Sequence, residues 1–279
     1  MTSALTSMWA WDNPVPASVD ARGRGYAPAA PGPLAGFCVD RELGLVLLGA
    51  PWAADEGPVG TWFTDACAAV AGTGARVGAL GGDPGWLTNP ALAVQWATTA
   101  LRAAPTATLV QLDVEPWTTP SWTTYRAQVV RRWLTLIRKV RAALPPGVPL
   151  GVDTPWWLAH EPGQTPGRTL LDDVLDRCDR VAVVAFADHA HGPDGIIALA
   201  GPAVVAASTA GHPFTVGVET DTPEVAGGPQ FTFYDEGPEV MEQETAEVAA
   251  AFGGLPGYEG VTVEHHRAWR HLLGLDTAS

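Results

Sequence analysis

Hydrophobic and polar positions follow two alternating patterns along this chain. Short runs rich in Val, Leu and Ile recur at intervals of roughly thirty to forty-five residues, and Ala- and Leu-rich stretches with helical spacing lie between them. The runs predict eight strands, near residues 8–11, 44–48, 76–80, 108–114, 149–152, 180–186, 214–218 and 260–263. The stretches between and after them predict helices over residues 34–43, 61–71, 91–103, 122–144, 169–178, 194–210, 238–252 and 267–273. This regular alternation predicts an α/β fold, a (β/α)8 TIM barrel.

The helix predicted over residues 122–144 has the clearest pattern. Val129, Trp133 and Leu136 fall on one face, arginines occupy the other faces, and Pro145 and Pro146 end the pattern. No change of composition divides the chain, and 279 residues is close to the roughly 250 usual for one barrel. We therefore expect a single domain over residues 1–279, with an irregular Pro- and Gly-rich loop at about 13–33 that can act as a mobile cover over a pocket.

The composition restricts the classes of partner and compartment. A net charge of -14 argues against nucleic-acid and anionic-membrane partners, because such contacts need clustered Lys and Arg, and it favours a neutral or cationic ligand. The first residues lack a basic segment followed by an apolar one, and no window reaches the roughly 18 apolar residues of a membrane span, so we expect a cytoplasmic protein. Cys38, Cys67 and Cys178 lack C-x-x-C spacing and fall in predicted helices, which predicts buried free thiols.

Acidic residues lie where a barrel strand would place them at its carboxyl end. Side chains of a barrel strand alternate between the barrel interior and the helix layer. In the fourth strand, apolar residues at every second place predict that Gln111, Asp113 and Glu115 point inward. The same parity in the seventh strand places Glu219 inside, opposite the first pair. Catalytic residues of TIM barrels come from such positions, so these three acids are the candidate catalytic residues.

Other strands also end in polar residues. The predicted mouth receives five further acids and one histidine, namely Asp12, Asp83, Asp153, Asp188, Glu264 and His265. For any single acid the alternative is a solvated loop carboxylate or a helix cap. Glu264, His265 and His266 can hold a sugar hydroxyl or complete a metal site, and Tyr234 can hydrogen-bond a nucleophile or belong to a turn before the helix at Pro238.

Paired carboxylates suit the cleavage of a glycosidic bond. One carboxyl must hold a proton for the leaving oxygen while an ionised one attacks or stabilises the sugar cation. We expect Glu115 to be the general acid and Glu219 the nucleophile or base. Asp113, two residues before Glu115, is expected to disfavour its ionisation and so to keep it protonated.

Tryptophan is abundant, with 12 residues in the chain. Several follow predicted strands, and Trp11, Trp52, Trp117 and Trp156 are the candidates for substrate contact. A Trp ring offers a flat apolar face and one N–H donor, which match the C–H face and the hydroxyl rim of a pyranose. The alternative for each is ordinary packing against the barrel or its helices.

These motifs resemble those of glycoside-hydrolase-type TIM barrels, especially actinobacterial glycosidase-like proteins. The segment 113–117, Asp-Val-Glu-Pro-Trp, is similar to the end of the strand-four signature of family-18 chitinases, which implies Glu115 as the acid and Asp113 as its helper. That signature has further acids where this chain has Thr108 and Gln111. Glu219 resembles the strand-seven nucleophile of clan-A retaining glycosidases, in which Asn usually stands at the position of Val114.

Two other functions fit the same residues. A metal-dependent barrel hydrolase or lyase acting on a small polar substrate would use carboxylate and histidine ligands, namely Asp113, Glu115, Asp188, His189 and Glu264. The metal motif H-E-x-x-H does not occur in the sequence. A barrel can also bind a carbohydrate without turning it over. We expect a small-molecule or oligosaccharide substrate and no cofactor; the sequence does not specify the oligomeric state.

Overall fold

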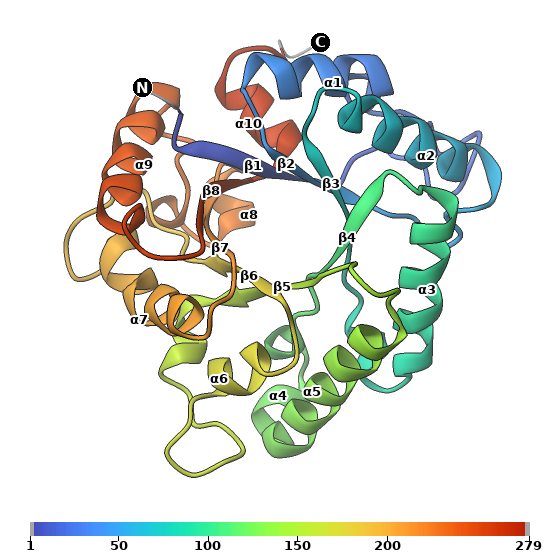
Figure 1. The fold of residues 1–279 in the computed structure, drawn as a ribbon. Coiled ribbons are helices and arrows are strands. Elements are labelled where there is room, and N and C mark those ends of the chain that lie inside the picture. The colour runs from blue at the N-terminus through green and yellow to red at the C-terminus, as the bar shows by residue number, and fades with distance from the viewer. Residues whose placement is uncertain (1–2, 277–279) are drawn as a thin grey trace.

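The computed structural model describes residues 3–276 and contains a closed barrel of parallel strands. Each strand pairs with the next along the chain, and the first pairs with the last (Figure 1). The strands are β1 (Leu5–Ala10), β2 (Leu45–Gly49), β3 (Arg76–Gly81), β4 (Ala107–Leu112), β5 (Leu150–Pro155), β6 (Arg180–Val184), β7 (Phe214–Glu219) and β8 (Tyr258–Glu264). The predicted α/β fold class, a (β/α)8 TIM barrel, is confirmed.

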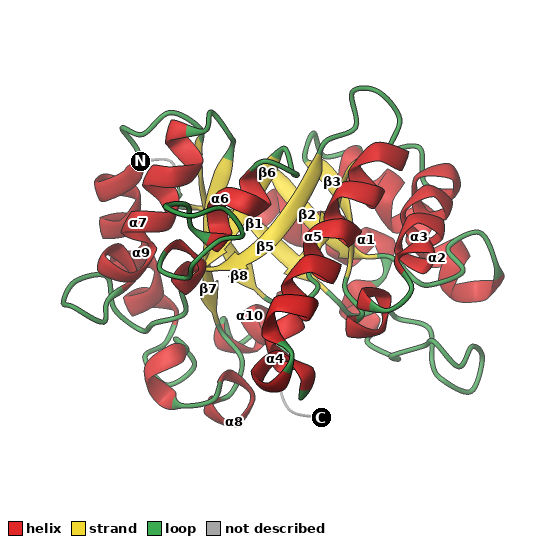
Figure 2. Cartoon of the chain, turned by 90° about the horizontal axis from the view of Figure 1, so that it is seen from below, coloured by secondary structure: helices red, strands yellow, loops and turns green. Residues whose placement is uncertain are grey.

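Helices surround the strands on the outside of the barrel (Figures 1 and 2). They are α1 (Pro31–Asp40), α2 (Gly57–Ala71), α3 (Pro90–Ala103), α4 (Ser121–Thr124), α5 (Arg126–Ala143), α6 (Leu170–Leu175), α7 (Ile196–Thr209), α8 (Pro223–Ala226), α9 (Pro238–Phe252) and α10 (His266–Leu272). Short 3-10 turns lie in the connections that follow several strands. None of the helices in residues 3–276 is long and apolar enough to span a membrane.

Two predicted helices differ from those observed. The helix predicted over 122–144 is broken at Tyr125, which has φ -129° and ψ 36° and caps the start of α5. The helix predicted over 169–178 ends at Leu175, so Cys178 lies outside it, although Cys178 is buried as expected. Its start at Thr169 is a capping box with Asp172, in which each side chain accepts the other residue's backbone N–H.

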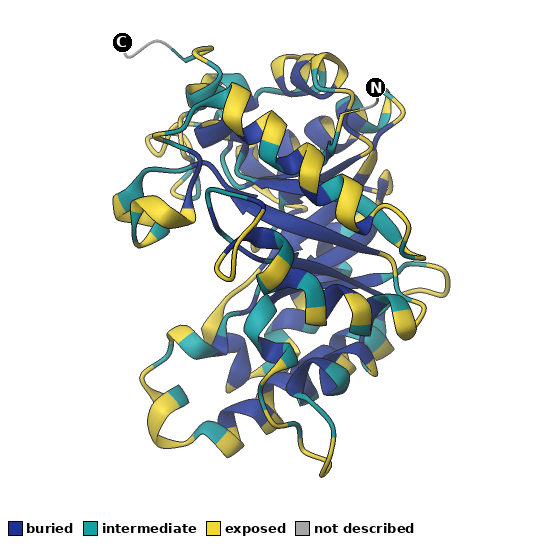
Figure 3. Ribbon diagram, turned by 90° about the vertical axis from the view of Figure 1, so that its left-hand side faces the viewer, coloured by how far each residue is buried: buried dark blue, intermediate teal, exposed yellow. Residues whose placement is uncertain are grey.

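The apolar core has two layers. The larger lies between strands and helices and contains Val110, Leu112, Val216 and Val218, as strand parity predicts. Figure 3 shows the strands buried and the outward helix faces exposed. A smaller layer fills the barrel interior and comprises Trp9, Leu45, Leu47, Leu80, Leu109 and Ala182. The Trp9 ring fits there because position 217 is glycine: a Cβ at Gly217 would lie 2.8 Å from that ring.

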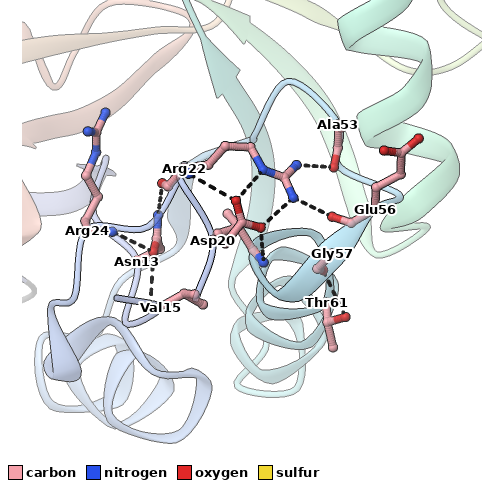
Figure 4. A network of polar contacts seen from close by, with 10 residues as sticks. Asn13, Val15, Asp20, Arg22, Arg24, Ala53, Glu56, Gly57 and Thr61 are labelled. Atoms are coloured by element: carbon pink, nitrogen blue, oxygen red, sulfur yellow. Dashed lines mark hydrogen bonds and ion pairs between the residues drawn. The ribbon is translucent and has the colours of Figure 1, made fainter. Parts of the chain in front are cut away.

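The loop between β1 and α1 is fastened by an arginine. The Arg22 guanidinium pairs with Asp20 at 2.7 Å and donates to the backbone carbonyls of Ala53 and Glu56, at 2.6 and 2.7 Å (Figure 4). Asn13 accepts two backbone N–H groups from the same loop. The predicted irregular loop is present up to the helix start at Pro31, and these contacts tie it to the β2–α2 connection; its movement over a pocket stays a prediction.

Candidate functional site

Four acidic side chains gather inside the barrel near the carboxyl ends of its strands. We call Asp113, Asp153, Glu219 and Glu264 the acid cluster. Burial raises the pKa of Glu264 well above the ordinary value. The negative charges of Glu219, Asp113 and Asp153 raise this pKa further. Side chains from β5, β7 and β8 and from the residue after β4 therefore share one low-dielectric site.

Asp153 forms the floor of the acid cluster. Its carboxylate accepts hydrogen bonds from Trp9 Nε1 at 3.2 Å and from Gln111 Nε2 at 2.8 Å. Burial, followed by the charge of Asp113, raises the pKa of Asp153. Asp113 in turn has a raised pKa, from burial and then from the charge of Glu115. The contact between Gln111 and Asp153 also shows that the inward parity expected for the fourth strand is correct at Gln111.

Glu219 ends β7 and is almost fully buried. Its Oε1 accepts the backbone N–H groups of Thr220 and Asp221, both at 2.8 Å. Burial raises the pKa of Glu219 to about 7, while these two hydrogen bonds oppose the rise because they stabilise the ionised form. At neutral pH Glu219 is therefore divided between its acid and its carboxylate.

Glu264 ends β8 and is held from two sides. Trp11 Nε1 donates to Glu264 Oε1 at 2.9 Å, which joins the first strand region to the last. The backbone carbonyl of Glu264 accepts both the N–H and the hydroxyl of Thr220, at 2.7 Å each. Trp11 and Glu264, both predicted to contact substrate, thus form part of one hydrogen-bonded unit with the residue after Glu219.

Glu115 lies beside the acid cluster, beyond the end of β4. The strand ends at Leu112, so Asp113 lies outside it although the predicted strand ran to Val114, and Glu115 precedes the short helix Pro116–Thr118. Burial raises the pKa of Glu115, and the Trp117 side chain opposes the rise. The repulsion expected from Asp113 acts mainly in the other direction, since it is the more deeply buried Asp113 whose pKa the charge of Glu115 raises.

Two cavities open on either side of Trp11 and Asp12. The first cavity, of about 380 Å³, lies at the ends of β1, β2 and β3, and its wall includes Trp11, Trp52, Arg24 and Gly82. The second cavity, of about 1020 Å³, lies at the ends of β1, β7 and β8. Neither of these two cavities is lined by the acid cluster or by Glu115. The acid cluster contacts them through its neighbours, Trp11 on one side and the residues after Glu219 and Glu264 on the other.

The second cavity contains several predicted substrate-binding residues. Asp12, Tyr234 and His265 all line it. His265 Nε2 lies 3.1 Å from a carboxylate oxygen of Asp221, a residue that the sequence analysis did not select. The expectation that Tyr234 hydrogen-bonds a nucleophile is not met: its hydroxyl lies 3.4 Å from His271 Nε2, on whose ring it stacks. Asp221 lies two residues after Glu219, the inward-facing residue that ends β7, and this position in the sequence could have identified it.

The remaining predicted residues make local contacts. Trp117 packs edge-to-face against Trp122, Trp133 and Trp157, and Trp156 packs edge-on near His160. Asp188 pairs with His189, whose other ring nitrogen lies 3.3 Å from Asp194.

Asp83 accepts the backbone N–H of Gly85 at 2.7 Å, which is the helix-cap alternative. Among residues 3–276, no three His, Cys, Asp or Glu side chains are arranged to hold a metal ion together.

Comparisons with known proteins find the same fold in solved structures. No protein-family model and no curated protein matches the chain. A chitinase from Rhizomucor miehei is 13% identical over 96% of this chain and 98% of its own, with a TM-score of 0.57. A chitinase from Chromobacterium violaceum is 12% identical over 99% of this chain and 100% of its own, with a TM-score of 0.51.

A spore cortex-lytic enzyme, SleL, from Bacillus cereus is 11% identical over 77% of this chain, with a TM-score of 0.46. This chain spans 51% of the length of SleL. At these identities the likeness is one of fold. In fold, the chain is a (β/α)8 barrel similar to those of the two chitinases.

Proposed function

We propose that the protein is a glycoside hydrolase in which Glu115 is the general acid and base and Glu219 is the nucleophile, or the base that activates water. The observation that carries the proposal is the acid cluster with Glu115 beside it: carboxyls with raised pKa values, at the end of the barrel where such folds hold their catalytic residues. Glycoside cleavage needs a carboxyl that keeps its proton near neutral pH beside one that can ionise. Two solved structures with this fold are chitinases.

Each residue has a role that its surroundings support. Burial favours the protonated form of Glu115, which would pass its proton to the oxygen of the leaving group. The two N–H groups on Glu219 Oε1 stabilise its carboxylate, and we assign Oε2 to the attack on the anomeric carbon. In a retaining reaction the resulting glycosyl ester is then hydrolysed by water, from which Glu115 removes a proton. The charge of Glu115 raises the pKa of Asp113, so we assign Asp113 to hold a proton beside Glu115 when Glu115 is ionised.

The test is hydrolysis of a panel of aryl glycosides by the wild type, Glu115→Gln and Glu219→Gln. Loss of a general acid should lower kcat/KM about 100- to 10,000-fold for phenyl glycosides and much less for dinitrophenyl glycosides, whose leaving group needs no proton. Loss of Glu219 should lower kcat/KM for the phenyl glycosides and for the dinitrophenyl glycosides alike. Glu242→Gln, on the exposed face of α9, is the matched control. Wild-type rates in either active-site variant, or no turnover of any glycoside by the wild type, would refute the proposal.

The alternative of carbohydrate binding without cleavage has one observation in its favour. The aromatic walls of the first cavity lie beside the acid cluster but do not include it. The same panel separates the two functions, since a binding protein would retain affinity for a sugar that it never cleaves. The anomeric configuration of the first product, followed by NMR, then distinguishes a nucleophilic Glu219 from a base.

A further inference from the structure

We propose that the first cavity is a subsite for an acidic sugar, whose carboxylate is bound by Arg24. The inference rests on the proposed function, because it names the substrate class of the same site. A net charge of -14 favours a neutral or cationic ligand. The first cavity differs locally: two arginines, Arg22 and Arg24, line it together with one acid, Asp83, whose carboxylate caps the turn at Gly85.

The two arginines of the first cavity differ in their contacts. The Arg22 guanidinium is occupied by Asp20 and by two backbone carbonyls. Arg24 is exposed, and within residues 3–276 no carboxylate lies at ion-pair distance from it. Figure 4 shows its side chain extending away from the loop network, which holds only its backbone N–H, bonded to Asn13. The backbone of Arg24 is thus fixed while its charge remains available.

The tryptophans of the first cavity differ in how far they are buried. Trp62 Nε1 donates to the carbonyl of Ala29 at 2.7 Å, and Trp96 Nε1 donates to that of Ala50 at 3.0 Å, and both rings are buried. Trp52 is 45% exposed. It therefore presents the open ring face on which a sugar can stack, in the same cavity as Arg24.

The first cavity adjoins the acid cluster at two points. Trp11 lines the cavity and donates to Glu264. Gly82 also lines it, and its backbone lies so close to Asp113 that a Cβ would be 1.8 Å from the Asp113 carbonyl oxygen. A volume of about 380 Å³ is near the lower end of the usual range for ligand pockets, which suits one or two sugar rings. A ring stacked on Trp52 would place the neighbouring glycosidic bond toward the acid cluster.

Arg24 would recognise the carboxylate through two parallel N–H donors. A guanidinium matches a carboxylate in this geometry, whereas an ammonium group offers only a point charge. Arg24→Lys should therefore keep part of the preference for acidic sugars, and Arg24→Gln should abolish it. Because Arg24 is exposed, the preference should weaken as ionic strength rises.

The experiment measures binding in a Glu115→Gln background, where cleavage does not interfere. The probes are short oligosaccharides that contain glucuronic or galacturonic acid, each paired with its neutral methyl ester, and titration calorimetry gives the Kd of each. We expect the acid form to bind about tenfold more tightly than its ester, and Arg24→Gln to remove this difference. Arg132→Gln, an exposed arginine of α5, makes the same change of net charge and should leave the preference unchanged.

The outcomes separate this inference from the proposed function. Equal binding of acid and ester, a preference that survives Arg24→Gln, or no binding of any pair at millimolar concentration would overturn the acidic-sugar subsite. Cleavage of neutral glycosides with no preference for acids would leave the proposed function standing without the subsite. Preferential binding of acids with no cleavage by the wild type would retain the subsite and refute the hydrolase.

Discussion

The buried charge of Glu219 should lower the free energy of unfolding of the protein, and the variant Glu219→Gln measures this cost. The rise in the pKa of Glu219 from 4.5 to about 7 means that the folded state disfavours the ionised carboxyl. At about 1.4 kcal/mol for each pKa unit, the cost to the folded state is about 3 kcal/mol once the group is fully ionised. Glutamine removes the charge, and its amide oxygen can still accept the N–H groups of Thr220 and Asp221.

The effect has a defined dependence on pH. Below pH 4.5 the carboxyl is protonated in both the folded and the unfolded state, so the charge costs nothing. Between pH 4.5 and about 7 the unfolded state loses its proton first, and the wild type loses stability relative to the variant. Above about pH 7 the difference is complete. Glu219→Gln should therefore be about 3 kcal/mol more stable than the wild type at pH 8 and equal to it near pH 4.

Urea unfolding followed by tryptophan fluorescence at four or five values between pH 4 and pH 8.5 provides the measurement. Glu242→Gln is again the control, because it removes a carboxyl from the exposed face of α9. A variant that is less stable than the wild type at pH 8, or one whose gain in stability is the same at pH 4, would refute the reasoning. A gain in stability together with a loss of turnover would show that the charge is kept for function and not for folding.

Two further predictions concern positions near the barrel. Gly82→Ala should lower the free energy of unfolding by about 2 kcal/mol and impair activity, because the added Cβ would displace the backbone of Asp113. Urea unfolding measures the change. Gly32→Ala is the control, because a Cβ added at Gly32 would have no atom within 4 Å. The three cysteine thiols, whose burial raises each pKa to about 12, should not react with Ellman's reagent at pH 8 in the folded protein, and all three should react in guanidinium chloride; fast labelling of any thiol in the folded state would contradict their burial.

The strand order and much of the barrel interior could be predicted from the sequence because both depend on local periodicity. The apolar residues of β4 and β7 alternate with inward-facing polar ones, so Gln111 and Glu219 are placed correctly without any knowledge of their partners. The end of β4 was placed two residues too late, since Asp113 and Val114 continue the alternation beyond Leu112, and the Asp113 N–H still bonds the Gly81 carbonyl at 3.0 Å.

The partners of the site residues could not be predicted, because they come from distant parts of the sequence. Trp11 bonds Glu264 across 253 positions and Trp9 bonds Asp153 across 144. Glu264 was expected to contact substrate or to complete a metal site, yet it is the acid whose pKa the charges of the other three raise. For Tyr234 the sequence left open a bond to a nucleophile or a turn before α9; residue 234 lies in a turn, and its hydroxyl is 3.4 Å from His271 Nε2 of α10. The catalytic roles, the single-domain organisation and the cytoplasmic location stay predictions.

Closure of the barrel by β1 and β8 has a consequence for synthesis on the ribosome. Until residues 258–264 have emerged, β1 and β7 each lack the strand β8 with which they pair in the closed barrel, and unpaired strand edges invite pairing with other chains. The same last strand delivers Glu264 among acids that already repel one another. The nascent chain thus acquires Glu264, whose ionised form is disfavoured by burial, only in the step that removes its exposed edges.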